Sequence, residues 1–247
     1  MIWVIGGTSD ANQLVKALRN KGIDEVLVST TTDYGNELAR KNNFEVIQKA
    51  LNEEGMQRVI GKYGVDLVID ASHPFAIEVS KNAIVASEKQ SVKYCRYERE
   101  QIPFDEVRYY DDYTSLMNSL KQLEGNILLT TGAKNIHLFE QLVGERLFAR
   151  VLATADSVAK CESIGLKPHQ IIAMNGRVLE DTNKALFNEY QIQHLVMKDS
   201  GEAGGMNEKV NAAKSLGIHI HVIKRPQLNY PQVSNSIEEI IKTIKPN

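Results

Sequence analysis

The sequence contains little cysteine, no large excess of one charge and no long hydrophobic run. The two cysteines, Cys95 and Cys161, stand far apart, and neither a C-x-x-C motif nor a nearby histidine pair predicts a metal site. A formal net charge of -2 gives no field that would attract nucleic acid or an anionic membrane. No run approaches the about 18 apolar residues of a membrane span, and the stretch 2–5 is too short for a signal peptide. We therefore expect a cytoplasmic protein that holds no metal and binds neither nucleic acid nor membranes.

Short β-branched segments alternate with amphipathic segments of helical length, which is typical of parallel strands joined by helical crossovers. The first half contains predicted strands near 2–5, 25–29, 45–48, 66–70 and 92–96. The second half contains predicted strands near 126–131, 147–152, 170–173, 194–198 and 219–223. We therefore predict an α/β fold with two Rossmann-like, doubly wound parallel-sheet domains, 1–105 and 106–247, that face a central cleft. The aromatic and acidic stretch 109–113 is predicted to lie in the linker region.

A glycine turn follows the first predicted strand. Gly6, Thr8 and Ala11 occupy the three places of a G-x-G-x-x-G/A fingerprint, with Thr8 in place of the second glycine. Gly6 and Gly7 would let backbone N–H groups approach a pyrophosphate at the positive end of the next helix. The alternative is a plain helix cap formed by Thr8 or Ser9. The position after the first strand of a βαβ unit favours a dinucleotide site.

The second predicted strand leads into Ser29, Thr30 and Thr31, with no carboxylate at its end. A site that prefers NAD usually offers an acidic residue to the ribose hydroxyl there. Hydroxyl groups accommodate a 2′-phosphate, so the absence favours NADPH over NADH. A simple polar turn explains the same residues equally well.

The fourth predicted strand ends in an unusual loop that contains Asp70, Ser72, His73, Pro74 and Phe75. Proline disfavours helix at the preceding residue, so the loop is expected to be stiff and to lie beside a ligand. His73 is a candidate for substrate contact or proton supply, and a hydrogen-bonded loop histidine is the alternative. Capping of the next helix is the alternative for Asp70.

Cationic side chains follow several predicted strands. Arg96 and Arg99 flank Glu98 after the fifth strand and suit carboxylate or phosphate groups, unless they form a surface ion-pair cluster with nearby glutamates. In the second half the turn Thr130–Lys134 repeats the strand, glycine and helix order, and Lys198–Gly205 combines a lysine with three glycines. Arg225 follows the last predicted strand. His219 and His221 alternate on that strand and are interpreted as structural.

Several enzyme classes lack support. The G-x-x-x-x-G-K-[ST] motif of nucleoside triphosphatases is absent, as is the G-x-S-x-G motif of serine hydrolases. The Tyr-x-x-x-Lys pair of short-chain dehydrogenases is also absent. These absences make a nucleotide-sugar dehydrogenase or epimerase less favoured, although it stays an alternative together with a non-catalytic NADPH-binding regulator.

Taken together, the glycine turn, the loop 70–76, the segment 96–99, the turn 130–134 and the segment 198–205 resemble the precorrin-6A reductases of cobalamin biosynthesis. The resemblance spans nearly the whole chain in the same order. It implies NADPH-dependent reduction of one double bond in the macrocycle of precorrin-6A, or cobalt-precorrin-6A, to the 6B form. It also implies that the cofactor lies on the first loop and that the tetrapyrrole fills the cleft.

The cofactor-binding residues are then expected to be Gly6, Gly7, Thr8, Ser9, Ser29, Thr30, Thr31, Ser72, His73, Lys198, Ser200, Gly201, Gly204 and Gly205. The substrate-binding residues are expected to be Asp70, Phe75, Arg96, Arg99, Thr131, Gly132, Lys134, Lys209 and Arg225. Precorrins carry many carboxylates, which agrees with cations placed where strands end. Hydride transfer depends chiefly on positioning, so binding roles are predicted before any acid role. The proton is expected to come from His73 or from water.

Overall fold

The structure is a computed structural model that describes residues 1–30, 45–99, 103–174, 177–201 and 204–244. The chain forms two compact units. Unit 1 consists of Met1–Gln101 and Pro226–Asn247, and unit 2 consists of Ile102–Arg225. Each contains a wholly parallel sheet of six strands.

The sheet of unit 1 has the order β12-β5-β4-β1-β2-β3, which places the first strand near its centre. Its strands are β1 (Ile2–Ile5), β2 (Val26–Thr30), β3 (Glu45–Gln48), β4 (Leu67–Asp70), β5 (Lys93–Tyr97) and β12 (Val233–Ser234). All four residues of β1 and of β4 are buried, as expected for central strands covered on both faces. The register pairs Ile5 with Ser29 on one side and with Asp70 on the other, so the loops after these three strands emerge together.

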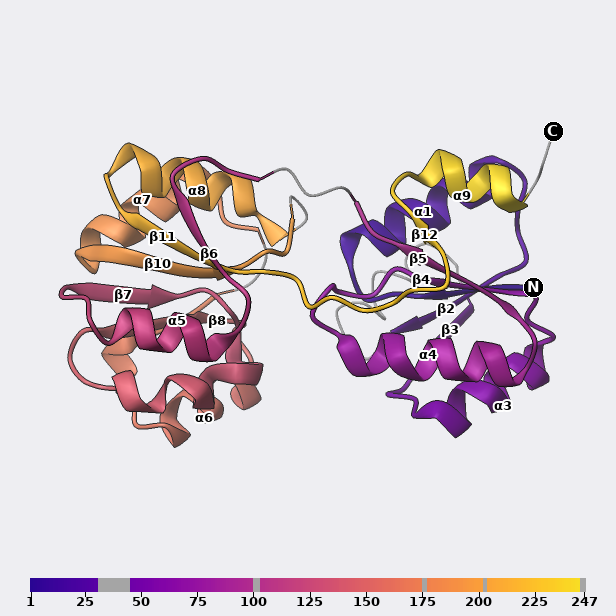
Figure 1. Cartoon of the computed structure of the whole chain (residues 1–247), viewed down its shortest axis with the longest axis horizontal. Helices are drawn as coiled ribbons and strands as arrows, with labels where there is room; N and C mark the ends of the chain where they lie inside the picture. Colours follow the sequence, from indigo (N-terminus) through magenta and orange to yellow (C-terminus); the bar gives the residue numbers. More distant parts are fainter. Residues whose placement is uncertain (31–44, 100–102, 175–176, 202–203, 245–247) are drawn as a thin grey trace. The chain divides into compact units, whose positions relative to one another are not determined.

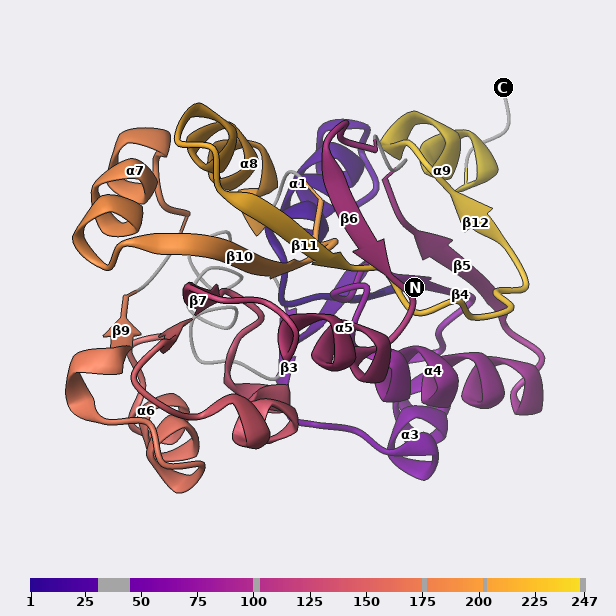
Figure 2. The same cartoon turned by 60° about the vertical axis from the view of Figure 1, so that its left-hand side comes forward.

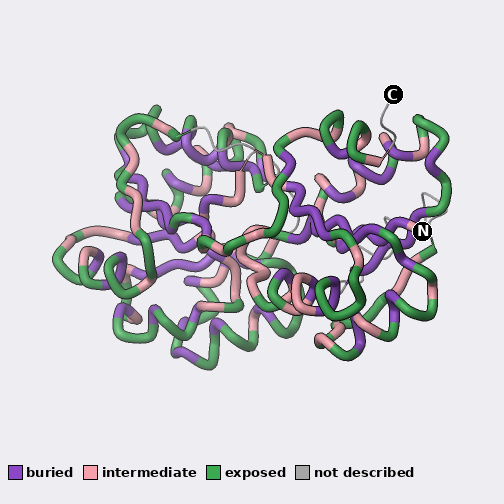
Figure 3. Tube along the Cα trace, turned by 45° about the vertical axis from the view of Figure 1, so that its right-hand side comes forward, coloured by how far each residue is buried: buried purple, intermediate pink, exposed green. Residues whose placement is uncertain are grey.

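Helices cover both faces of this sheet. They are α1 (Ser9–Asn20), α3 (Glu53–Tyr63), α4 (Ile77–Lys89) and α9 (Ile237–Ile244). In Figure 1, α1 and α9 lie on one face and α3 and α4 on the other. Side chains such as Leu14 and Ile240 fill the first core, and Trp3 and Met56 belong to the second. Figure 3 shows the same layering, with buried strands inside and exposed helix surfaces outside.

The sheet of unit 2 has the order β6-β11-β10-β7-β8-β9. Its strands are β6 (Val107–Tyr110), β7 (Asn126–Leu129), β8 (Leu147–Val151), β9 (Ile171–Ala173), β10 (Ile192–Lys198) and β11 (His219–Ile223). Its helical segments are α5 (Tyr113–Leu120), η1 (Ala133–Leu142), α6 (Ala155–Ser163), η2 (Pro168–Gln170), α7 (Glu180–Glu189) and α8 (Met206–Ser215). Figure 1 shows α7 and α8 on one face and α5 and α6 on the other. Phe148, Phe187 and Val210 pack in the core under α7 and α8.

The ten predicted strands are all present with small differences at their ends, and the α/β fold is confirmed. Two edge strands were not predicted. The strand β6 overlaps the stretch 109–113 that was expected in the linker region, and none of its four residues is fully buried. The remainder of that stretch caps and begins α5, because Asp112 Oδ1 accepts a hydrogen bond from Ser115 N at 2.7 Å. The other missed strand, β12, has two residues, too few to give an alternating pattern.

The end of the chain corrects the predicted domain assignment. Residues 226–247 were expected in the second domain, but they belong to unit 1. The cause is strand pairing: Val233 pairs with Arg96, and α9 packs beside α1. Figure 2 shows β12 next to β5 at the edge of the first sheet. The sheet of unit 1 therefore contains strands from both ends of the sequence.

Two smaller expectations concern cysteine and membranes. Both cysteines are buried, and they form no disulfide with each other. Among the described residues, no helix is long and apolar enough to cross a bilayer, and no group of three or more candidate side chains could hold a metal ion.

Candidate functional site

The glycine turn after β1 has the geometry of a nucleotide loop. Gly7 has a φ of 102°, a conformation that residues with a side chain rarely adopt. A Cβ on Gly6 would lie 3.3 Å from the Ala11 side chain and 3.4 Å from Ser29 O, so the backbone packs closely against β2 and α1. Helix α1 begins at Ser9, directly after the turn. Backbone N–H groups and the positive end of a 12-residue helix thus meet at one place, which fits a pyrophosphate.

A cavity of about 180 Å³ opens beside this turn. Its lining comes from the carboxyl ends of several parallel strands of unit 1, where ligands bind in open α/β sheets. The residues that form it are Ile5, Gly6, Gly7, Thr8, Ser29, Thr30, Lys49, Leu51, Met56, Ser72, His73, Ala76 and Val79. The structure thus brings together seven of the residues predicted to bind the cofactor. Thr31 lies outside the described residues.

Two hydroxyl groups in this cavity wall are already used by the fold. Thr8 Oγ1 accepts a hydrogen bond from Ala11 N at 3.1 Å and donates one to Ala71 O at 3.0 Å. Ser29 Oγ accepts a hydrogen bond from Trp3 Nε1 at 3.0 Å. The Thr8 side chain therefore caps α1, as the helix-cap interpretation expected. Any contact between Thr8 and a ligand would be made by the Thr8 backbone. The bond to Ala71 ties the glycine turn to the loop after β4.

Asp70 and Arg96 form a buried ion pair, which corrects the expectation that both contact the substrate. The exposed fractions of Asp70 and Arg96 are 0% and 1%. Asp70 Oδ1 accepts from Ser72 N and from Arg96 Nη1, both at 3.0 Å. Its Oδ2 accepts from Ser80 Oγ at 2.6 Å and from Tyr94 OH at 2.8 Å. The carboxylate is fully occupied, so its role is to hold the loop that follows β4.

The Arg96 guanidinium has a similar anchoring role. Its Nη1 also donates to Asp70 O at 3.3 Å and to Ser72 Oγ at 3.3 Å, and its Nε donates to Glu98 Oε2 at 3.1 Å. Burial alone would lower the Arg96 pKa, but the charges of Asp70 and Glu98 outweigh it and raise the pKa. Burial, followed by the Asp70 charge, strongly raises the pKa of Tyr94. Arg96 therefore keeps its charge and the Tyr94 phenol stays neutral.

The loop after β4 brings Ser72 and His73 to the cavity. Ser72 is buried, whereas His73 is exposed. His73 Nδ1 accepts a hydrogen bond from Phe75 N at 3.2 Å, and the two rings lie 5.8 Å apart at 47°. A neutral His73 therefore carries its proton on Nε2. Phe75, expected to touch the substrate, stays half-buried beside this ring.

Arg99 connects the end of β5 to the start of α1. Its Nη2 forms an ion pair with Asp10 Oδ1 at 2.9 Å and donates to Gln13 Oε1. Its Nε donates to Tyr97 OH at 3.4 Å. The side chain is 35% exposed, so it remains accessible at the helix terminus.

In unit 2 the predicted turn after β7 meets the end of β10. Thr131 is buried, and its Oγ1 has no hydrogen-bond partner among the described residues. Gly132 has a φ of 75° and begins η1, which carries the exposed Lys134. Burial lowers the pKa of Lys198 to about 8, and the charge of Lys134 adds to the effect. Lys134 follows β7 and Lys198 ends the neighbouring strand β10, so both cations lie at the carboxyl edge of this sheet, where an anion could bind.

The glycine segment after β10 is held by Arg225. Arg225 Nε donates to Asp199 O at 3.2 Å and lies 3.5 Å from Asp199 Oδ1, and both side chains are buried. Gly201 has a φ of 68°, and a Cβ there would lie 3.0 Å from Arg225 Nη2. Arg225 thus supports the segment, and its expected contact with the substrate stays a prediction.

Further along this segment, glycine is required at two places. A Cβ on Gly204 would lie 2.0 Å from Ser200 Oγ, and Gly205 has a φ of 65°. Gly205 begins α8, which has no side-chain cap. Lys209 lies in this helix and is buried.

Three histidines form a packed cluster on β10 and β11. His194 Nε2 lies 2.8 Å from Glu124 O and must donate to it, so His194 Nδ1 accepts from His221 Nε2 at 3.2 Å. His221 Nδ1 then accepts from Tyr110 OH at 3.0 Å. His219 stacks on His194 with ring centroids 5.3 Å apart. Burial lowers the pKa of His221 to about 4, and neighbouring positive groups add to the effect. The structural interpretation of His219 and His221 agrees with this chain of bonds.

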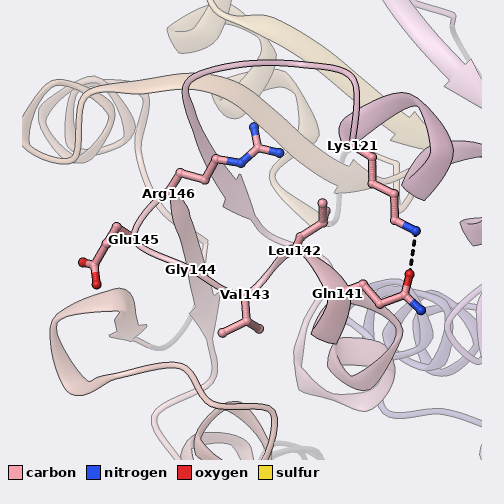
Figure 4. A pocket seen from close by; sticks show the side chains of 7 residues that line it. All are labelled: Lys121, Gln141, Leu142, Val143, Gly144, Glu145 and Arg146. Carbon is pink, nitrogen blue, oxygen red and sulfur yellow. Dashed lines mark hydrogen bonds between the residues drawn. The ribbon is translucent and has the colours of Figure 1, made fainter.

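A larger hollow in unit 2, about 460 Å³, lies at the other end of the sheet. Figure 4 shows its lining from Lys121 and residues 141–146, with Lys121 Nζ donating to Gln141 Oε1 at 2.5 Å. Arg146 precedes β8, so the hollow lies at the amino end of that strand. Its Nη2 donates to Leu120 O at 3.2 Å, which engages the guanidinium with the end of α5. The hollow is therefore separate from the carboxyl edge where the predicted residues gather.

Two cations were missed by sequence reasoning. Lys49, the first residue after β3, lines the cavity of unit 1. Arg150, near the end of β8, is partly buried, and burial lowers its pKa to about 10. The same strand-end rule that selected Arg96 would have found Lys49. Arg150 lies inside a strand, so only the fold could show its surroundings.

Two parallel sheets flanked by helices, with a glycine turn after the first strand, define a Rossmann-like nucleotide-binding protein. A model of the family described as precorrin-6x reductase CbiJ/CobK matches residues 1–245. The chain is 35% identical over 250 residues to the cobalt-precorrin-6A reductase of Priestia megaterium, covering 99% of this chain and 98% of that protein. It is 36% identical over 245 residues to the cobalt-precorrin-6A reductase of Methanocaldococcus jannaschii, covering 98% and 96%.

A solved structure shows the same fold. The CobK precorrin-6A reductase aligns with a TM-score of 0.78 at 24% identity, covering 98% of this chain and 95% of that one. The chain belongs to the precorrin-6x reductase family, which comprises oxidoreductases of cobalamin biosynthesis that reduce a double bond of a tetrapyrrole ring. The predicted family is thus confirmed. Family and fold together indicate a nicotinamide cofactor.

Proposed function

We propose that this protein uses NADPH to reduce one macrocycle double bond of precorrin-6A, or of cobalt-precorrin-6A, to the 6B form. Family membership supports the reaction, and the choice of NADPH depends on the cavity of unit 1. Lys49, Ser29 and Thr30 line that cavity together with the glycine turn. A cation and a buried Ser-Thr pair suit a 2′-phosphate, whereas a site for NADH would offer a carboxylate.

Lys49 is the observation that carries this proposal. It follows β3, the strand that pairs with β2, and Gln48 lies opposite Thr30 in the register. The side chain is exposed, and it forms no ion pair with another described residue. The sequence has no arginine next to Ser29. Lys49 supplies the positive charge in its place.

The chain's own residues have defined tasks in the proposed reaction. The backbone of Gly6 and Gly7 would hold the cofactor pyrophosphate, and the Asp70–Arg96 pair fixes the loop that carries His73. The cofactor supplies a hydride when bound. The second hydrogen is a proton, which a protonated His73 would donate from Nε2, because Nδ1 faces Phe75 N. The cations of unit 2, Lys134 and Lys198, would neutralise substrate carboxylates.

Comparing NADPH with NADH tests the cofactor assignment. We expect Lys49→Met to lower kcat/KM for NADPH at least about tenfold, the effect of about 1.4 kcal/mol, and to change the value for NADH less than about twofold. Lys62→Met, at the exposed end of α3, is the control and should change neither value. Equal use of both cofactors by the unaltered protein would overturn the NADPH assignment.

Turnover is measured by nicotinamide oxidation together with the absorbance of the macrocycle. The assay supplies precorrin-6A and cobalt-precorrin-6A separately, which identifies the form that is reduced faster. A protein that binds NADPH but reduces neither form would support a regulatory role instead. The low cysteine content and the lack of a disulfide between Cys95 and Cys161 fit a reducing compartment, and we place the protein in the cytoplasm.

A further inference from the structure

The buried indole of Trp3 donates its side-chain N–H group to a residue of the cofactor cavity. Trp3 lies in β1, and its exposed fraction is 0%. It pairs with Leu27 of β2, and Ser29 is two residues further along β2, so Trp3 and Ser29 project from the same face of the sheet. Trp3 Nε1 lies 3.0 Å from Ser29 Oγ. An indole N–H can only donate, so Ser29 Oγ is the acceptor.

Ser29 also belongs to the wall of the cavity beside the glycine turn. Because Trp3 occupies one lone pair of Ser29 Oγ, the hydroxyl hydrogen cannot point toward the indole. That hydrogen has no acceptor among the described residues, and the side chain is buried. A buried donor without an acceptor is unfavourable. The Ser29 hydroxyl is therefore suited to donate to a ligand in the cavity.

A second hydroxyl in the wall of the same cavity is held in a similar way. Ser72 Oγ accepts a hydrogen bond from the buried Arg96 Nη1 at 3.3 Å, and its own hydrogen meets no acceptor in the part of the chain that the structure describes. The register places Ser29 on one side of Ile5 and Asp70, two residues before Ser72, on the other. Hydroxyl donors therefore reach the cavity from both strands that flank β1.

These donors favour a ligand group that only accepts hydrogen bonds. Among the described residues that line the cavity, Lys49 adds a cation and none carries a carboxylate. A phosphate monoester carries a charge of about −1.5 to −2 near neutral pH and offers three acceptor oxygens. A ribose hydroxyl is neutral and also has a hydrogen of its own to donate. The wall therefore suits the 2′-phosphate that distinguishes NADPH from NADH.

We propose that Trp3 is a positioning residue for cofactor specificity, because its indole N–H holds the Ser29 hydroxyl as a donor toward the 2′-phosphate of NADPH. This inference rests on the proposed function, since it concerns the cofactor assigned there. Trp3 is not one of the residues that line the cavity, so it acts through Ser29. A hydrogen bond accepted from the indole and one donated to the phosphate polarise the same hydroxyl and strengthen each other.

A double-mutant cycle, measured by calorimetric titration with NADPH and with NADH, tests whether Trp3 acts through Ser29. Ser29→Ala should raise the Kd of NADPH about tenfold, and Trp3→Phe, which keeps an aromatic core but removes the N–H, about threefold or more. In the Ser29→Ala background, Trp3→Phe should add less than about 1.5-fold, because no hydroxyl remains to be positioned. The Kd of NADH should change less than about twofold in all three variants.

Val68→Ala is the matched control in the same core. Val68 lies opposite Trp3 on β4, is fully buried and does not line the cavity. Its replacement should lower the Tm through a core cavity while changing the Kd of NADPH less than about twofold. If Val68→Ala weakened NADPH binding as much as Trp3→Phe, or if the effect of Trp3→Phe persisted in full beside Ser29→Ala, core packing would explain the result and the inference would be overturned.

A spectroscopic measurement tests the inference without replacing Trp3, and it serves if Trp3→Phe fails to fold. Trp3 is the one tryptophan of the chain, so its indole gives a single signal in a proton–nitrogen correlation spectrum. NADPH should shift that signal at least about twice as far as NADH, and Ser29→Ala should abolish the difference. Equal shifts in a protein that prefers NADPH would overturn this inference alone. Equal affinity of the unaltered protein for both cofactors would overturn the NADPH assignment, and this inference with it.

Discussion

Arg96 Nη1 lies 3.0 Å from Asp70 Oδ1 across the neighbouring strands β5 and β4, and both side chains are excluded from solvent. The pair joins two strands to the loop that carries His73. Removing one partner leaves a buried charge without compensation, which typically costs about 3–5 kcal/mol. We expect Arg96→Met to lower the free energy of unfolding by about that amount, measured by urea denaturation.

The exposed pair of Lys89 and Glu53, 2.6 Å apart, is the control for this prediction. Lys89→Met should lower the free energy of unfolding by less than about 1 kcal/mol. If Arg96→Met kept full stability and raised only the KM of the tetrapyrrole, the direct substrate contact predicted from sequence would be restored.

Alanine substitutions at Gly7 and Gly64 distinguish the effect of backbone strain from an effect on cofactor binding. Both have positive φ, 102° and 59°, and neither would bring a Cβ into a clash. Alanine at either place should destabilise the protein by about 1–2 kcal/mol, because residues with a side chain disfavour this conformation. Only Gly7→Ala should raise the KM of NADPH, by about tenfold or more, because Gly7 lines the cavity and Gly64 ends α3. Equal cofactor kinetics in the two variants would remove the nucleotide-loop assignment.

The histidine cluster predicts how stability depends on pH. The pKa of His221 is about 4 in the folded protein and 6.5 ordinarily, so the unfolded chain takes up the proton first. This contribution is complete above about pH 6.5 and is lost as the pH falls toward 4, with a slope of up to about 1.4 kcal/mol per pH unit. Urea unfolding of His221→Asn between pH 7 and 4 should show a shallower slope, by up to one proton.

His169, an exposed histidine, serves as the control for that slope. His169→Asn should leave the pH dependence unchanged. A slope in His221→Asn identical to that of the unaltered protein would show that the cluster does not control acid stability.

His73 can be assigned by separating kcat from KM. If it supplies the proton, His73→Gln should lower kcat by about 10²–10⁴-fold and alter the pH profile of kcat. If it only contacts a ligand, KM should rise while kcat and its pH profile stay the same. Single-turnover kinetics with NADPH distinguish the two results, and unchanged kinetics would leave His73 as a loop residue bonded to Phe75.

Ligands of open α/β sheets bind at the carboxyl ends of the strands, and this rule explains how much of the site the sequence could predict. The register places Ser29 and Asp70 on either side of Ile5, so the loops that follow all three strands had to converge. The same rule does not say which side chains stay accessible. Asp70 and Arg96 lie at the predicted edge, but their side chains are buried, because each pairs with the opposite charge of the other and with further hydrogen-bonding partners.

By itself, the sequence determined the α/β fold, ten of the strands, the glycine turn and the family, because these follow from hydrophobic periodicity, local backbone requirements and ordered motifs. Only the tertiary structure decided two other matters. It returned residues 226–247 to unit 1, and it paired Asp70 with Arg96 inside the protein. Both outcomes depend on contacts between residues that are far apart in the sequence, and a local sequence pattern does not predict such contacts.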